Sequence, residues 1–226
     1  MAFLPPQRLM IRLSHPCPYV AEMPQNLTVA TAPLLNLPNN GIIHPHAALE
    51  GQQTFAELRL GWNERGLGVE AVIRGKRQPL QGDQTRPGSC DGVHLWLATR
   101  PAGTSRRATR YCFHFVLLAT GCGSERDQPG VTALRIPRAV QETPLPDTQS
   151  CLIRRLPERS GGRYDYRLHA FLPAVALPGY DPVEVPTLGF FFLVRDHELG
   201  DQFLAFDWNF PISEDPALWD QLELVR

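Results

Sequence analysis

The chain has 226 residues, a net charge of −1 and 43% hydrophobic residues, enough apolar material for one large β domain or two small ones. Its charges form no long run of one sign, so the charge pattern predicts neither a nucleic-acid nor a membrane partner. No apolar stretch approaches the roughly 18 residues of a membrane span or forms a signal peptide, and five cysteines without a Cys-x-x-Cys pair indicate reduced thiols in a cytoplasmic protein.

The first third of the chain predicts an extended segment followed by a β-hairpin. Residues 1–50 are rich in proline and asparagine, and we expect them to pack on the core as an extended N-terminal segment. From Phe55 to Trp62 apolar and polar residues alternate with the period of a half-buried strand. The alternation stops at Asn-Glu-Arg-Gly and resumes from Leu67 to Ile73, as expected for two strands joined by a tight turn.

The middle and end of the chain predict more strands and one short helix. In "DGVHLWLATR", at 91–100, every second residue from Val93 to Leu97 faces one side, and His94 and Trp96 face the other. A fourth strand is predicted in "RYCFHFVLLAT" at 110–120, and others at 131–136, 151–156, 164–172, 187–194 and 202–208. Ser213 or Asp215 can cap a short helix that has Pro216 in its first turn.

About nine short strands, frequent glycine and proline, and the lack of a long amphipathic helix predict an all-β protein, a β-sandwich. The sequence contains no internal repeat and no linker-like stretch. We therefore expect one domain that spans residues 1–226.

Five segments between Phe55 and Val225 occur in a distinctive order: "WNERGL", "DGVHLWLATR", "YDYRLHAFLPAVAL", "LGFFFLVRD" and "DPALWDQLEL". The ordered set resembles the family 9 carbohydrate-binding modules and the DOMON-like domains similar to them, in a bacterial branch. The resemblance implies a jelly-roll-like sandwich of two antiparallel sheets. It also implies a sugar site in which two aromatic rings enclose a terminal sugar, with structural calcium in some members.

Two positions depart from the pattern of these modules. His94 stands where the modules carry glutamate, and residues 87–90, Pro-Gly-Ser-Cys, lack the aromatic residue that tends to precede Asp91. One of the two enclosing rings therefore has no clear counterpart, which places sugar binding itself in question.

Six residues are candidates for ligand binding, namely Trp208, Trp96, Asp91, His94, Asn209 and Arg110. An indole can stack on the apolar face of a sugar while Asp91 or His94 bonds a hydroxyl group. In the alternative, Trp96 packs in a second layer and Asp91 caps a turn. By resemblance, Trp208 and Asn209 lie where related modules present their second aromatic residue. Arg110 belongs to an arginine-rich stretch that either holds an anionic group or forms a solvated loop.

Metal and catalytic sites have weaker support. Cys90, His94, Cys112 and His114 are zinc-ligand types, but their spacing is not a common zinc spacing. Carboxylates between 196 and 207 suit calcium but lack the spacing of an EF-hand. We expect no metal and no cofactor, with calcium as the alternative. Because no catalytic motif occurs, we predict a non-catalytic module for a sugar or similar polar ligand. A protein-interaction or assembly module is the alternative, and a metal-dependent or hydrolytic enzyme comes third.

Overall fold

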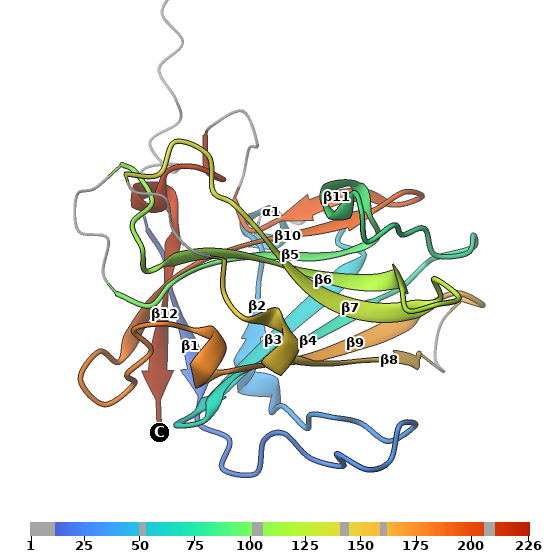
Figure 1. Ribbon diagram of the computed structural model, residues 1–226, viewed down its shortest axis with the longest axis horizontal. Helices are drawn as coiled ribbons and strands as arrows, with labels where there is room; N and C mark the ends of the chain where they lie inside the picture. The colour runs from blue at the N-terminus through green and yellow to red at the C-terminus, as the bar shows by residue number, and fades with distance from the viewer. Residues whose placement is uncertain (1–11, 50–52, 101–105, 141–144, 159–161, 206–210) are drawn as a thin grey trace, which may run out of the picture.

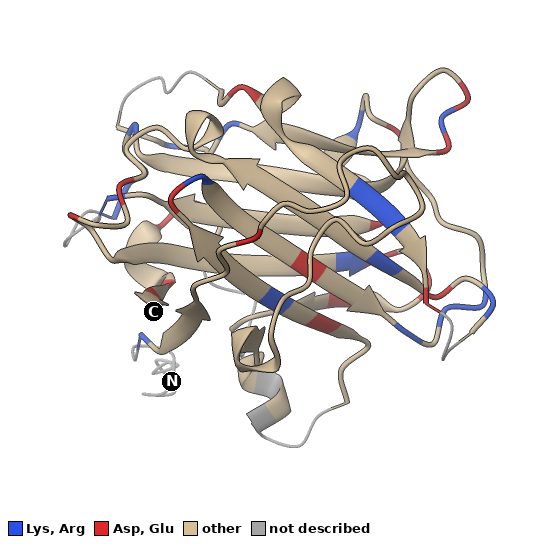
Figure 2. Cartoon of the chain, turned by 90° about the horizontal axis from the view of Figure 1, so that it is seen from below, with Lys and Arg blue, Asp and Glu red and all other residues tan. Residues whose placement is uncertain are grey.

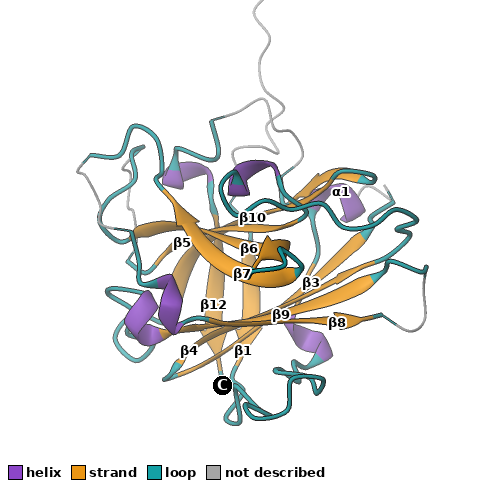
Figure 3. Cartoon of the chain, turned by 45° about the vertical axis from the view of Figure 1, so that its right-hand side comes forward, coloured by secondary structure: helices purple, strands orange, loops and turns teal. Residues whose placement is uncertain are grey.

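The computed structural model describes residues 12–49, 53–100, 106–140, 145–158, 162–205 and 211–226. Two β-sheets pack face to face around one shared apolar core (Figures 1 and 3). Acidic and basic residues are interspersed over strands and loops, in keeping with the net charge of −1 (Figure 2). Within the described ranges, no helix has the length and hydropathy needed to cross a membrane. The predicted all-β sandwich is confirmed.

The larger sheet has seven strands. In spatial order they are β1 (Ser14–Pro18), β12 (Asp220–Val225), β10 (Thr187–Asp196), β5 (Gly92–Ala98), β6 (Cys112–Cys122) and β7 (Gln128–Leu134), with β11 (Gly200–Phe203) also paired to β10. Every pair is antiparallel except β1 on β12, which is parallel. The sheet is therefore mixed, because the N-terminal segment contributes an edge strand beside the C-terminal one.

The smaller sheet has five antiparallel strands. Their order is β2 (Ile42–Ile43), β3 (Ala56–Asn63), β4 (Gly66–Ile73), β9 (Tyr166–Pro173) and β8 (Leu152–Pro157). The predicted hairpin is confirmed, with Trp62 opposite Leu67 and Asn63 opposite Gly66. Gly66 has a φ of 151°, and an added Cβ would lie 2.2 Å from the carbonyl oxygen of Leu172, so glycine is required at this position.

Among the described residues, helical structure is confined to single turns. The turns are α1 (His46–Leu49), η2 (Asn39–Gly41), η3 (Pro87–Ser89), η4 (Thr148–Ser150), η5 (Ala174–Ala176) and η6 (Pro216–Leu218). The carboxylate of Asp215 accepts the backbone N–H of Ala217 at 2.9 Å, so the predicted cap is confirmed on a 3₁₀ turn.

Period-two alternation builds the core from both sheets. Val93, Leu95 and Leu97 of β5 point inward and are fully buried, and burial of each such side chain contributes about 1.5–3 kcal/mol. The N-terminal segment forms a second apolar cluster on the outer face of the smaller sheet, made of Met23, Leu34, Leu35, Leu37 and Phe171. Strand β10 is apolar on both faces because Phe190 and Phe192 face the core while Phe191, on the other side, is also covered.

Candidate functional site

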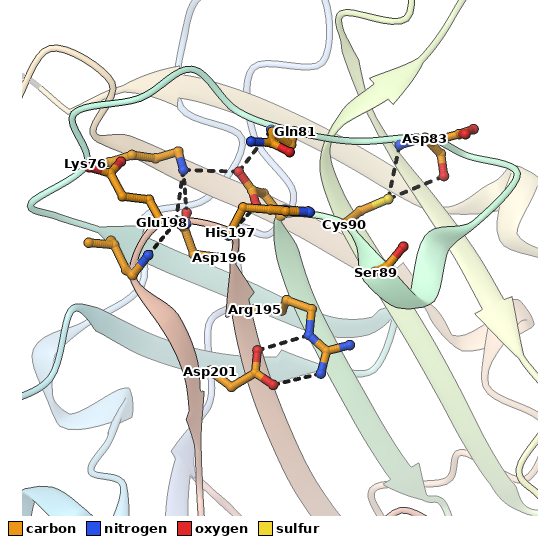
Figure 4. Close-up of polar contacts among 12 residues, drawn as sticks. Lys76, Gln81, Asp83, Ser89, Cys90, Arg195, Asp196, His197, Glu198 and Asp201 are labelled. Carbon is orange, nitrogen blue, oxygen red and sulfur yellow. Dashed lines mark hydrogen bonds and ion pairs between the residues drawn. The ribbon is translucent and has the colours of Figure 1, made fainter.

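Polar side chains gather where β5 begins and β10 ends (Figure 4). The antiparallel register pairs Gly92 with Arg195, so the residue before β5, Asp91, lies beside Asp196 at the end of β10. Residues 81–91, which we call the 81–91 loop, reach this end of the sheet from one side. The β10–β11 turn reaches it from the other. Pairing of two strands distant in sequence therefore assembles the cluster.

A buried lysine forms the centre of this cluster. The Nζ of Lys76, the only lysine in the sequence, lies 3.1 Å from Oδ2 of Asp91 and 2.9 Å from the carboxylate of Asp196. All three side chains are fully buried. Burial opposes the charge on the ammonium group, but the hydrogen bonds to Asp196 and Asp91 outweigh it and raise the pKa of Lys76. The cation that neutralises these two aspartates is thus a side chain of the protein itself.

Asp91 also holds an exposed histidine in place. Both the backbone N–H and Nδ1 of His197 lie 2.8 Å from Oδ1 of Asp91. Burial raises the pKa of Asp91, but the N–H of Gln81 and the contacts with His197 and Lys76 outweigh it and lower that pKa below its usual value. An ionised carboxylate only accepts, so Nδ1 carries the proton and Nε2 is the acceptor of the neutral ring. The His197 side chain is 39% exposed, which gives this ring access to solvent.

A guanidinium–carboxylate pair lies next to this histidine. Nε of Arg195 donates to Oδ1 of Asp201 at 2.9 Å, and Nη2 donates to Oδ2 at 2.7 Å. Nη1 of Arg195 donates to the carbonyl of Gly88 and so joins the pair to the 81–91 loop. About a third of each side chain in the pair is exposed. Donor and acceptor groups therefore alternate along this end of the sheet.

The thiol of Cys90 organises the same loop. Its Sγ accepts the backbone N–H of Asp83 at 3.0 Å, and it lies 3.3 Å from the carbonyls of Asp83 and Arg86 (Figure 4). Cys90 is 2% exposed. The structure thus gives this thiol the role of a buried filler that fixes the loop.

The candidate ligand residues lie in different environments. Asp91 is fully buried and contacts Lys76 and His197. A ligand at the surface would therefore contact the His197 ring that Asp91 holds, and not Asp91 itself. Trp96 is 2% exposed and stacks on His114, with ring centroids 4.0 Å apart and planes 17° apart. In contrast to an exposed stacking platform, this placement matches the alternative in which Trp96 packs in a second layer.

Two other candidates, His94 and Arg110, are not part of this cluster. His94 is buried, and its Nδ1 lies 3.0 Å from Nε2 of His114. Arg110 is exposed, and its guanidinium lies 5.0 Å from the ring centroid of Tyr111, near the opposite end of β5. Trp208 and Asn209 lie outside the described residues.

The four zinc-type residues are not gathered into one ligand set within the described part of the chain. His94 and His114 contact each other, whereas Cys90 contacts Asp83 and Cys112 lies 3.7 Å from the hydroxyl of Thr109. Burial lowers the pKa of His94 to about 4 and that of His114 to about 3, so both rings are neutral at pH 7.

Sequence reasoning missed His197 and Arg195. The acidic residues around them were interpreted as oxygen ligands for calcium or as a solvated turn. Lys76, the only lysine of the chain, was also not recognised, because its being the only lysine does not by itself indicate burial. Only the register of β5 and β10 reveals that His197 lies on Asp91.

Two open clefts flank the edge strand β8. One has a volume of about 550 Å³ and is lined in part by Thr31, Arg155 and Glu158. The other has a volume of about 340 Å³ and is lined in part by Leu80, Tyr164 and Tyr166. The second cleft is the alternative location for a small ligand, because it presents tyrosine side chains.

The sequence matches no protein-family model and no curated protein. Solved structures do match, and two of them are of a family 9 carbohydrate-binding module from Caldicellulosiruptor kristjanssonii. The complex with cellotriose gives a TM-score of 0.58 and 15% identity over 94% of this chain and 93% of the other. The complex with glucose gives 0.59 and 14% over 94% and 95%. The chain therefore has the β-sandwich fold of these modules, and the resemblance drawn from the ordered segments is confirmed.

Proposed function

We propose that this chain is a non-catalytic carbohydrate-binding module that recognises a neutral sugar or polyol where β5 begins and β10 ends. The fold, shared with modules solved in complex with cellotriose and glucose, supports the class of ligand. The observation that carries the location is the exposed His197 ring held by the buried Asp91 carboxylate, beside the Arg195–Asp201 pair.

Adjacent hydroxyl groups of a sugar each need one donor or one acceptor. Nε2 of His197 accepts a hydrogen bond, the guanidinium of Arg195 donates, and the carboxylate of Asp201 accepts. Asp91 fixes the imidazole before the ligand arrives, which reduces the conformational entropy lost on binding. Trp208 and Asn209 remain predictions for the stacking side of the same ligand.

The two buried aspartates of the cluster are placed to hold other residues and not to reach a ligand. Asp91 and Asp196 are fully buried and both contact the ammonium group of Lys76. General acid–base catalysis requires a carboxyl group within hydrogen-bond reach of the substrate. In this geometry, the two aspartates serve to position the exposed residues.

Calorimetric titration with glucose, cellobiose and cellotriose tests the proposal. We expect millimolar or tighter binding to the wild-type chain and about a tenfold loss in His197→Ala, the equivalent of one hydrogen bond of about 1.4 kcal/mol. His44→Ala is the matched control because His44 is exposed and lies outside the cluster. Tyr164→Ala tests the alternative cleft beside β8.

These experiments test separately whether the chain binds a carbohydrate and where on the chain the carbohydrate binds. A glycan array without binding at millimolar concentrations would reject the carbohydrate ligand altogether. Binding that survives in His197→Ala and is lost in Tyr164→Ala would move the site to the cleft beside β8. Light scattering coupled to size exclusion tests the alternative of an assembly module, which predicts a defined oligomer.

A further inference from the structure

A second polar cluster lies at the other side of the seven-stranded sheet, where β1, α1 and β12 meet. Nε2 of His15 and Nε2 of His46 each lie 2.9 Å from Oδ2 of Asp220. These three atoms all lie within 4.8 Å of one another. The residues are far apart in sequence, and the parallel pairing of β1 with β12 brings His15 beside the start of β12.

The three side chains of the cluster are mostly buried, but each keeps a small exposed fraction. The side chain of His15 is 12% exposed, that of His46 is 7% exposed and that of Asp220 is 5% exposed. The backbone N–H of Leu13 donates to Oδ1 of Asp220 at 3.1 Å, which orients the carboxylate and leaves Oδ2 directed at the two imidazoles. Such a partner on the far oxygen is what holds a ligating carboxylate in place in metal sites.

Asp220 is a carboxylate whose neighbours are themselves potential metal ligands. Within the described ranges its ion pairs are with the two histidines, and neither lysine nor arginine reaches it.

The donor atoms and their spacing suit a transition metal. Two imidazole nitrogens and one carboxylate oxygen are ligands of Zn²⁺ and its neighbours, whereas Ca²⁺ prefers oxygen alone. In a tetrahedral site, ligand atoms about 2.0–2.2 Å from the ion lie roughly 3.3–3.6 Å from one another. The two nitrogen–oxygen separations of 2.9 Å must therefore lengthen by roughly 0.5 Å to admit the ion, and the two nitrogens lie within 4.8 Å of each other.

We propose that Nε2 of His15, Nε2 of His46 and Oδ2 of Asp220 bind one divalent transition-metal ion of the zinc class. The ion cancels the buried charge and ties the N-terminal β1 and α1 to the C-terminal β12. Three protein ligands leave a fourth position for water or another donor. In the competing arrangement, both Nε2–H groups donate to Oδ2 and no metal binds.

The test uses the full chain without a histidine tag, stripped with a chelator and then dialysed. Titration with zinc chloride against a competing indicator should give one equivalent bound with about micromolar affinity or tighter. Cobalt chloride should give a visible absorption band whose intensity reports the number of ligands. His15→Ala should weaken zinc binding on the order of 10–100-fold.

Matched variants keep the result interpretable. His44→Ala removes an exposed histidine outside the cluster, and His114→Phe removes one of the other buried histidines, so both should bind zinc as the wild type does. Far-ultraviolet circular dichroism checks that His15→Ala is folded. Histidine ring ¹⁵N spectra of the wild type add a readout without mutation, because Nε2 of His15 and His46 should shift on addition of zinc.

Less than a tenth of an equivalent of zinc bound by the stripped wild type would overturn the proposal. Full affinity retained in folded His15→Ala, or ring shifts at His94 and His114 instead, would overturn it as well. Neither result bears on the sugar titrations, because the cluster shares no residue with the Asp91–His197 site.

Discussion

Two histidine pairs contact the seven-stranded sheet, and they differ in one neighbour. His15 and His46 share the carboxylate of Asp220, whereas His94 and His114 contact each other and, among the described residues, no carboxylate hydrogen-bonds to either ring. Without a carboxylate, burial lowers the pKa values of His94 and His114 to about 4 and 3, and the rings stack with Trp96 as aromatic packing. A buried acid is thus the difference on which the proposed metal site depends.

Asp91 can be compared with Asp220, because its cation is the ammonium group of Lys76, a side chain of the protein itself. Lys76→Met keeps most of the side-chain volume but leaves Asp91 and Asp196 buried without an ammonium group. We expect a loss of about 3–5 kcal/mol in the free energy of unfolding, measured by urea denaturation followed by circular dichroism. Arg77→Met is the control, because Arg77 is exposed and should change stability by no more than about 0.5 kcal/mol. An equal loss in both variants would contradict a central role for Lys76.

As the pH is lowered, the loss of stability should begin at the His94–His114 pair, which has no carboxylate partner among the described residues. The unfolded histidines take up protons near pH 6.5, whereas folded His114 stays neutral until its lowered pKa of about 3. The unfolded state therefore binds more protons below pH 6.5, and stability falls with pH. His114→Phe should reduce this loss between pH 7 and pH 4.5 by roughly 3 kcal/mol, measured by denaturation at each pH. The aspartates do not interfere, because the pKa values of Asp91 and Asp220 are lowered.

His169 provides the internal reference for that experiment. Burial also lowers its pKa to about 4, and it lies on the smaller sheet, where its Nδ1 accepts the backbone N–H of Leu35. Its share of the acid loss should remain in His114→Phe. A completely flat profile in that variant would mean that the histidines of the two sheets do not titrate independently.

The fold could be predicted because alternation reports directly on burial. Strands β3, β4 and β5 follow the period-two pattern of the sequence, and Asp215 caps its turn as the local sequence requires. Alternation does not reveal whether the outer face of a sheet is covered. Trp96 and Phe191 lie on that face and are buried in one cluster with Ala108, a residue that the sequence pattern leaves outside the predicted strands.

The sites could not be predicted because they depend on which strands are neighbours. Asp91 meets His197 only because β5 pairs with β10, and His15 meets Asp220 only because β1 lies parallel to β12. The alternation within one segment indicates on which face of its own strand a side chain lies. Register across more than a hundred residues comes from the packing of the whole core, which no single segment encodes.

The pair around Asp220 should give a smaller effect than the loss of Lys76. His46→Phe removes one of the two imidazoles but leaves His15 and the backbone N–H of Leu13 on the carboxylate. In the presence of a chelator, we expect a loss of about 1–2 kcal/mol, typical of one hydrogen bond to a charged group. His44→Phe is the control. If zinc binds as proposed, the difference between wild type and His46→Phe should widen when zinc replaces the chelator.

The smallest predicted effect concerns the charges of Arg195 and Asp201. It shows whether these surface charges contribute to the difference between the two histidine pairs. Burial is the largest cause of the lowered pKa of His94, the charge of Arg195 lowers it further and that of Asp201 raises it. Because Asp201 remains in Arg195→Gln, the pKa of His94 should rise toward 6.5. Stability at pH 7 should fall by no more than about 1 kcal/mol, because the pair is partly exposed and screened by solvent. Histidine nuclear magnetic resonance titration measures the shift, with Arg226→Gln as a control at the exposed pair with Glu64. An unchanged pKa would mean that burial alone keeps His94 neutral, and the Asp220 carboxylate would then be the sole electrostatic difference between the pairs.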